Sequence, residues 1–156
     1  MASKLNRRRL TDTIYVHCYD TPPNLDADMA MVRRWHTDPP PRGNGWLAEG
    51  YHYGIKRDGT LEKGRDTPLI GAGVAGHNAT SVHVAMAGGR AARGRGPEDN
   101  FTPAQWKTLK LTLESLRRRY PKTIIKGHNE DDPGKYCPSF NVAAWLAENG
   151  IQRDTR

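Results

Sequence analysis

The chain has 156 residues, and 36% of them are hydrophobic, which suits one compact domain with a buried core and leaves no room for a second. No apolar run approaches the roughly 18 residues of a membrane span. The basic residues near the N-terminus are not followed by the apolar stretch of a signal peptide. We therefore expect no integral membrane association and a protein that stays in the cytoplasm of the cell that makes it until something else releases it.

The formal net charge of +7 predicts attraction to polyanions such as nucleic acid, acidic lipid or the anionic polymers of a bacterial envelope. The basic residues are spread along the chain, with few aromatic residues among them to stack on bases. Their main groups lie at residues 7–9, 33–34, 90–95 and 117–119. We therefore expect a solvated basic surface and no specific nucleic-acid site.

The first half of the chain predicts a strand, a helix and a hairpin. The apolar stretch Thr13–Cys18 indicates a strand, and the apolar stripe of residues 26–36 indicates a helix that ends before three consecutive prolines. Two extended runs, at 51–55 and 61–64, flank an Asp-Gly pair that is typical of a hairpin turn.

The second half of the chain predicts two more strands and two more helices. A strand at Ser81–Met86 leads into a glycine- and arginine-rich stretch, 88–97, which we interpret as a mobile surface loop. The helix expected over 101–120 has the clearest start, because Thr102 can cap it and Gln105 completes a capping box. The remaining elements are a strand at 123–126 and a closing helix at 140–149.

The alternation of strands and helices predicts the fold class. It favours an α/β fold, in which a single domain has a central mixed β-sheet flanked by helices. We expect this domain to cover residues 13–150. A basic, flexible N-terminal segment, 1–12, would precede it, and a C-terminal tail, 151–156, would follow it.

Two histidines and a cysteine form the most informative pattern in the sequence. His128 and Cys137 lie close together near the C-terminus, and His17 lies far upstream. Two imidazoles and a thiolate suit Zn²⁺, and three protein ligands leave a fourth position open for water, as in catalytic zinc sites. From the spacing alone, a histidine beside an acidic loop can equally be a surface or capping residue.

Cys18, the second of the two cysteines, is interpreted as a small buried hydrophobic residue. Neighbouring side chains of a strand point to opposite faces, so Cys18 faces away from a metal that His17 contacts. The alternative is a disulfide between Cys18 and Cys137. The four other histidines are expected outside the site, at positions 36, 52, 77 and 83.

Four segments in the same order resemble zinc-dependent N-acetylmuramoyl-L-alanine amidases of the type-2 amidase and peptidoglycan-recognition-protein family. The first is Thr-Ile-Tyr-Val-His-Cys at Thr13–Cys18. The second is Gly-Trp-Leu-Ala-Glu-Gly-Tyr-His-Tyr-Gly-Ile-Lys-Arg-Asp-Gly-Thr at 45–60. The others are Asn-Phe-Thr-Pro-Ala-Gln at 100–105 and the stretch from His128 through Lys-Tyr-Cys-Pro-Ser-Phe at 135–140. The resemblance covers nearly the whole chain.

The resemblance implies an enzyme with one zinc ion. It implies that His17, His128 and Cys137 are the metal ligands, and that Tyr51 and Lys135 are catalytic. The reaction would be hydrolysis of the amide bond between N-acetylmuramic acid and L-alanine in bacterial peptidoglycan. Judged without the resemblance, Tyr51 can be a half-buried strand tyrosine and Lys135 a solvated loop cation.

The sequence departs from the family pattern in three places. The loop from His128 to Cys137 is one residue longer than in related phage enzymes. The segment at 71–73 lacks a histidine that relatives often have, and His83 stands where a glycine is usual. These changes can alter the substrate groove, and they remove none of the expected zinc ligands.

The resemblance also implies how the protein is used. It predicts a monomeric phage endolysin that waits in the host cytoplasm, reaches the cell wall after a holin opens the membrane, and lyses the host. One alternative is a peptidoglycan-recognition module without catalysis. Another is a regulatory binder and inhibitor of phage RNA polymerase, for which residues 4–9 would be the contact.

Overall fold

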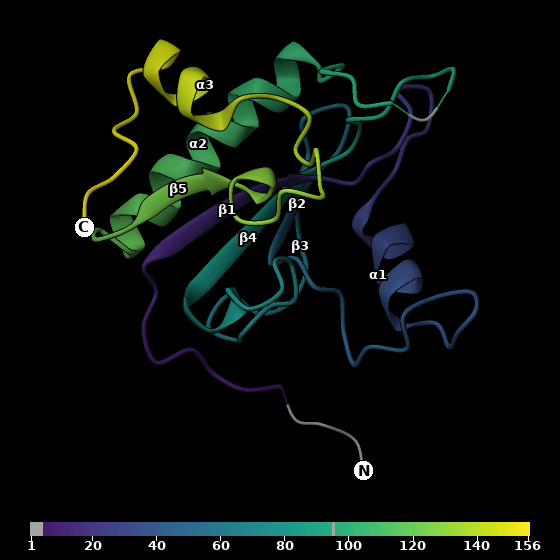
Figure 1. The fold of residues 1–156 in the computed structure, drawn as a ribbon, viewed down its shortest axis with the longest axis horizontal. Coiled ribbons are helices and arrows are strands. Elements are labelled where there is room, and N and C mark those ends of the chain that lie inside the picture. The colour runs from purple at the N-terminus through teal and green to yellow at the C-terminus, as the bar shows by residue number, and fades with distance from the viewer. Residues whose placement is uncertain (1–4, 95) are drawn as a thin grey trace.

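The computed structural model describes residues 5–94 and 96–156. Within these residues the centre is a five-stranded sheet in the order β3-β2-β4-β1-β5 (Figure 1). The strands are β1 (Thr13–Cys18), β2 (Tyr53–Ile55), β3 (Leu61–Lys63), β4 (Ser81–Met86) and β5 (Ile124–Gly127). β3 runs antiparallel to β2 and the other pairings are parallel, so the predicted mixed sheet is confirmed.

Helices cover both faces of the sheet, as Figure 1 shows. α2 (Pro103–Arg119) and α3 (Val142–Glu148) lie on one face, and α1 (Met29–Thr37) lies on the other. Two short 3₁₀ helices, η1 (Asn78–Thr80) and η2 (His128–Glu130), precede β4 and follow β5.

The alternation of side chains along β1 separates an apolar core from a polar face. Ile14, Val16 and Cys18 point into the core beneath α2 and α3. Tyr15 and His17 occupy the intervening positions and point to the opposite face. The core also contains the inward residues of β4, α2 and α3, namely Val82, Val84, Met86, Leu109, Leu113, Leu116 and Leu146.

α2 begins as its sequence predicts. The Thr102 hydroxyl accepts a hydrogen bond from Gln105 N–H at 3.1 Å, and the Gln105 side chain accepts one from Thr102 N–H at 3.0 Å. This reciprocal pair satisfies two of the backbone donors at the helix start. The Gln105 side chain is buried, and its amide group also donates to the Ala87 carbonyl oxygen at 2.8 Å, which ties the helix to the end of β4.

α1 and β2 begin later than expected. α1 begins at Met29 rather than at residue 26, because the Asp28 carboxylate caps it by accepting from Met31 N–H at 2.9 Å. β2 begins at Tyr53 rather than at residue 51. Residues 51 and 52 leave the regular ladder, although His52 N–H still donates to the His83 carbonyl oxygen at 3.0 Å.

The described part of the basic N-terminal segment is held against the domain. Arg8 N–H donates to the Pro68 carbonyl oxygen at 2.8 Å, and the Arg8 guanidinium donates to the Leu69 carbonyl oxygen at 2.6 Å. Ile70 N–H donates to the Asn6 carbonyl oxygen at 2.7 Å. Residues 1–4, which include the first residue of the segment 4–9 predicted to contact a polymerase, lie outside the described residues.

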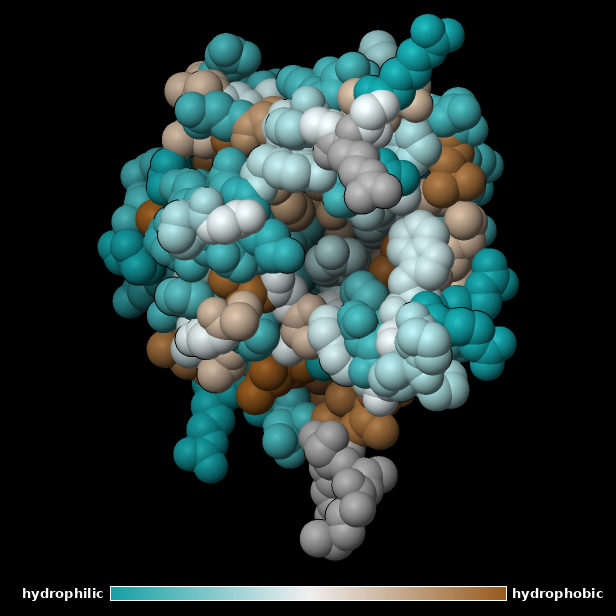
Figure 2. Space-filling model, turned by 45° about the vertical axis from the view of Figure 1, so that its right-hand side comes forward, coloured by the Kyte–Doolittle hydropathy of each residue, from teal (hydrophilic) through white to brown (hydrophobic). Residues whose placement is uncertain are grey.

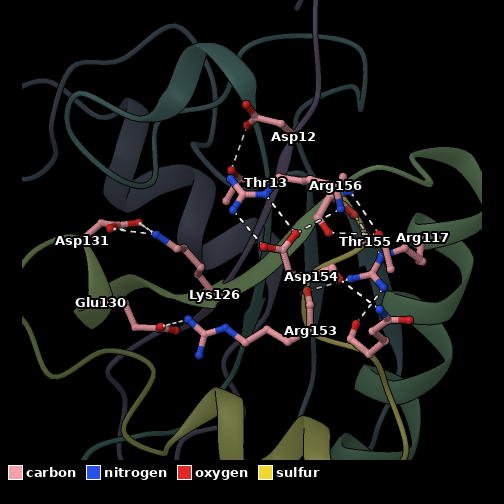
Figure 3. Close-up of polar contacts among 12 residues, drawn as sticks. Asp12, Thr13, Arg117, Lys126, Glu130, Asp131, Arg153, Asp154, Thr155 and Arg156 are labelled. Carbon is pink, nitrogen blue, oxygen red and sulfur yellow. Dashed lines mark hydrogen bonds and ion pairs between the residues drawn. The ribbon is translucent and has the colours of Figure 1, made fainter.

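The C-terminal residues are also anchored, as an extended segment along β5 (Figure 3). Ile125 N–H donates to the Arg153 carbonyl oxygen at 2.9 Å, and Thr155 N–H donates to the Thr123 carbonyl oxygen at 2.9 Å. The guanidinium of Arg117 on α2 donates to the Arg153 carbonyl oxygen at 3.0 Å. These bonds satisfy backbone groups that β5 would otherwise present at an open sheet edge.

One face of the molecule presents few apolar side chains to solvent. The face drawn in Figure 2 is mainly hydrophilic, with hydrophobic side chains in small separate patches and a hollow near its centre. Among the described residues, no helix has the length and apolar character needed to cross a membrane.

The glycine- and arginine-rich stretch, 88–97, folds back on itself, because Ala91 N–H donates to the Gly96 carbonyl oxygen at 3.0 Å. Arg95 lies outside the described residues.

Candidate metal centre and active site

The strand register brings two of the predicted ligands together. β1 and β5 are parallel and pair Val16 with Gly127. His17 and His128, the next residue in each case, therefore lie at the same level near the carboxyl ends of adjacent strands. Their ring centroids are 5.0 Å apart. His17 is fully buried and His128 is partly exposed, so the pair reaches from the interior to the surface.

The loop after η2 brings Cys137 to the same place. Asn129 N–H donates to the Cys137 carbonyl oxygen at 2.8 Å, which closes the loop, and Cys18 N–H donates to Cys137 Sγ at 3.2 Å. Cys137 Sγ lies 3.8 Å from His17 Nδ1. One ligand atom from each of His17, His128 and Cys137 lies within 4.8 Å of the other two.

This donor set fits a zinc ion. Two imidazole nitrogens and one thiol sulfur are donors that Zn²⁺ prefers, and three protein ligands leave one tetrahedral position open. Burial lowers the pKa of His17 and of His128, so both rings are neutral and each has a lone pair for a cation. Burial raises the pKa of the Cys137 thiol, so a cation that binds there must displace its proton.

The cysteines do not form a disulfide. Cys18 is buried in the apolar core, and both thiols are free. The interpretation of Cys18 as a buried hydrophobic residue is therefore confirmed. Its contribution to the site comes from its backbone, which donates to the Cys137 sulfur.

A hollow of about 310 Å³ opens over the cluster. Its lining includes two of the three cluster residues, His128 and Cys137, together with Tyr51 and Lys135. His17 is fully buried and lies next to this lining, with its ring centroid 5.0 Å from that of Tyr51. The structure thus brings all five predicted site residues to one place.

Tyr51 is packed among other aromatic rings. Its ring stacks on Tyr19 with centroids 6.0 Å apart and meets His36 edge-on at 5.4 Å. Burial, reinforced by the nearby Cys137, raises the pKa of Tyr51 well above its ordinary value. Its hydroxyl therefore keeps its proton at neutral pH and can act as a hydrogen-bond donor.

Lys135 is an exposed side chain at the rim of the hollow. Its backbone N–H donates to the Asp132 carbonyl oxygen at 3.0 Å, a turn that sets the direction of the loop. The preceding part of the loop is held by an ion pair between Lys126 Nζ and Asp131 Oδ2 at 3.0 Å, visible in Figure 3. The position of Lys135 allows its ammonium group to approach a ligand in the hollow.

Two neighbours of the cluster were not predicted from the sequence. We expected His83 to lie outside the site, and this is wrong: His83 Nδ1 lies 2.9 Å from His17 Nε2. The signal is visible only after β1 and β4 are known to be neighbours, because the register pairs Tyr15 with His83. A second missed contact joins His128 Nε2 and Asp132 Oδ2 at 3.5 Å.

The fold is the one found in solved N-acetylmuramoyl-L-alanine amidases and peptidoglycan recognition proteins. The chain superimposes on N-acetylmuramoyl-L-alanine amidase LysC from Clostridium intestinale URNW with a TM-score of 0.77 and 23% identity, over 97% of this chain and 93% of that one. At this identity the likeness concerns the fold.

The sequence comparison is more specific. The profile described as N-acetylmuramoyl-L-alanine amidase matches residues 7–140. The endolysin of Enterobacteria phage K11 is 43% identical over 92% of this chain and 90% of its own length. The endolysin of Escherichia phage T7 is 37% identical over 98% and 97%. The chain therefore belongs to the N-acetylmuramoyl-L-alanine amidase family.

Proposed function

We propose that the protein is a zinc-dependent phage endolysin that hydrolyses the amide bond between N-acetylmuramic acid and L-alanine in bacterial peptidoglycan. One observation carries the proposal: His17, His128 and Cys137 converge beneath a hollow that Tyr51 and Lys135 also line. Family membership supplies the substrate class, and the donor set supplies the choice of metal.

The chain's own side chains would bind and orient the substrate. When bound, Zn²⁺ would supply a Lewis acid that activates water and polarises the amide carbonyl. As the carbonyl oxygen gains negative charge, the Lys135 ammonium would stabilise it electrostatically from the rim of the hollow. The protonated Tyr51 hydroxyl would donate a hydrogen bond that orients the water or the substrate.

A neighbouring hollow offers room for the rest of a polymeric substrate. It measures about 570 Å³, and Tyr136 lines both hollows. The side chains of Glu130 and Arg153, which form an ion pair, also line it, so it presents both charges to a ligand. We propose that peptidoglycan extends from the cluster into this second hollow.

The protein would act after release from the host cytoplasm, when a holin opens the membrane. The net charge of +7 would hold it near the anionic envelope. This electrostatic attraction predicts that lysis weakens steeply as salt is added, because salt screens interactions between exposed charges. Lysis that does not depend on salt would show that the net charge does not hold the protein at the envelope.

The test is mass spectrometry of the products released from purified peptidoglycan, by zinc-loaded protein and by protein stripped with a chelator. The proposal predicts free stem peptides that begin with L-alanine, beside intact glycan strands, only when metal is present. New reducing sugar ends would instead indicate a glycosidase. Binding to the wall without any product would indicate a recognition module.

A regulatory contact with phage RNA polymerase stays a prediction. The described part of the basic segment presents Arg7 and Arg9 at the surface, whereas Arg8 is engaged with the domain. Capture of the polymerase by the full-length protein, compared with a variant that lacks residues 1–10, would test it. Equal capture, or none, would remove this segment as the contact. The monomeric state is likewise a prediction, which sedimentation would test.

A further inference from the structure

His83 is a buried histidine that contacts a predicted ligand without being one. It lies in the middle of β4, is fully buried, and places Nδ1 2.9 Å from Nε2 of His17. His17 uses its other nitrogen to face the cluster, because His17 Nδ1 lies 3.8 Å from Cys137 Sγ. The two nitrogens of His17 are therefore directed to two different partners.

When a cation binds on the Nδ1 side of His17, this geometry determines which ring nitrogen carries the proton. A neutral imidazole that offers Nδ1 to a cation carries its single proton on Nε2. His17 Nε2–H then donates to His83 Nδ1, which accepts with its lone pair. The proton of the neutral His83 ring is left on Nε2. In metalloproteins the group that accepts from the second nitrogen of a ligand histidine sets the tautomer and the orientation of the ring.

The ring of His83 is clamped in the orientation that this bond needs. It stacks between Tyr15 and His52, with centroids 5.6 Å away on each side and interplanar angles of 8° and 5°. The backbone N–H of His83 donates to His52 Nδ1 at 2.9 Å, which fixes the His52 ring beside it. A Cβ atom added to Gly73 would lie 2.4 Å from His83 Nδ1, so only glycine leaves room for the ring.

The far side of the ring shows that stability alone does not explain a histidine here. His83 Nε2 is buried and has no hydrogen-bond partner among the described residues. A buried polar atom without a partner lowers stability, and an apolar side chain at the same position would avoid that loss. Within the part of the chain that the structure describes, the ring makes its one polar contact with His17.

We propose that His83 is a positioning residue, which accepts the hydrogen bond from His17 Nε2–H and thereby holds His17 Nδ1 toward the metal. This inference rests on the proposed zinc-dependent function. It assigns His83 no contact with the metal or the substrate. Its predicted effect is on the affinity of the metal site and on the tautomer of His17.

The test compares His83→Leu with His83→Asn, two side chains of nearly the same shape. Both remove the ring and its stacking, but only asparagine keeps an acceptor oxygen close to the position of Nδ1. Zinc affinity is measured by competition with a chromophoric chelator, and apo-protein stability by urea denaturation. We expect His83→Leu to bind zinc about 10- to 100-fold more weakly than the wild type, the usual effect of losing such a partner, and His83→Asn to recover most of that loss.

A second variant leaves the histidine in place and displaces its ring. Gly73→Ala introduces the close contact with Nδ1, and the backbone of Gly73 is not in the left-handed region, so alanine is compatible with it. We expect zinc affinity to fall as it does in His83→Leu. Nitrogen-15 NMR of the zinc-loaded wild type should show the His83 ring proton on Nε2 and His83 Nδ1 accepting a hydrogen bond from His17 Nε2–H, a signature that a role confined to packing would not produce.

The outcomes separate this inference from the function on which it rests. A wild type that binds no zinc would overturn the proposed function. A wild type that binds zinc, with His83→Leu and Gly73→Ala of equal affinity to it, would overturn the role of His83 alone. Equal losses in His83→Leu and His83→Asn would also overturn it, because they would show that the ring acts by packing and not as an acceptor.

Discussion

The two faces of the central sheet are built from the same strands and serve opposite purposes. Toward α2 and α3, the strands present aliphatic side chains and one thiol, which close into a core. Toward the other face, β1 and β4 present Tyr15, His17 and His83, which are buried almost as completely but carry polar atoms. Burial is thus similar on the two faces, and chemistry distinguishes them.

The molecule thus separates the residues that stabilise the fold from those that can carry its chemistry. Apolar burial contributes stability in rough proportion to the area removed from water, whereas buried polar atoms contribute only when they are paired. The polar face contains a buried His83 nitrogen that has no partner among the described residues, and a cluster of three groups that could hold a metal ion. Changes on the apolar face should therefore act on folding, and changes on the polar face on metal binding and turnover.

The largest expected effect on the polar face comes from Cys137→Ser. Serine is a poor substitute for a thiolate ligand, so zinc retention and lytic activity should both fall to background while the domain stays folded. Turbidity loss of a cell-wall suspension and the metal content after dialysis measure the two effects. Cys18→Ala is the matched control, since it removes the other thiol and keeps the backbone N–H. Lysis by Cys137→Ser at the wild-type rate would show that Cys137 is not a metal ligand.

Lys135→Ala should separate turnover from metal binding. The variant should retain its zinc, because Lys135 is not a ligand, and its rate should fall about 10²- to 10³-fold, as is common when one donor to a developing oxyanion is lost. Lys122→Ala removes an exposed lysine elsewhere and serves as the control. Near-normal turnover would show that Lys135 is only a surface charge.

The apolar face should respond in the opposite way. Leu113→Ala removes a fully buried side chain of α2, and truncations of this kind cost about 2–5 kcal/mol of unfolding free energy. Urea denaturation of the metal-free protein measures that loss. The zinc affinity of the molecules that remain folded should not change. A large drop in affinity without a drop in stability would contradict the separation of the two faces.

The smallest expected effect is a dependence of stability on pH that originates on the polar face. Burial lowers the pKa of His52 to about 4, against an ordinary value of 6.5, so the unfolded chain takes up a proton in this range before the folded one does. The free energy of unfolding should therefore fall as the pH falls from about 6.5 to about 4. His52→Asn, studied without metal, should show a shallower fall, and an unchanged slope would exclude His52 as a contributor.

The sequence predicts most of the apolar face and only part of the polar one. β1 and β4 have the expected bounds, and the Thr102 capping box forms as predicted, because these features depend on local patterns. The contact between His17 and His83 depends instead on which strands are neighbours in the sheet, which no local pattern states. The pairing of the C-terminal segment with β5 is likewise a contact between distant parts of the chain, so local patterns do not predict it.

The central expectation is that the three converging residues, His17, His128 and Cys137, bind one metal ion. Cobalt titration tests this claim directly, because Co²⁺ occupies zinc sites and gives a charge-transfer absorption when a thiolate binds it. The account predicts one Co²⁺ per chain, with a thiolate band that disappears in Cys137→Ser and persists in Cys18→Ala. Saturation without a thiolate band, or a band that survives in Cys137→Ser, would contradict it.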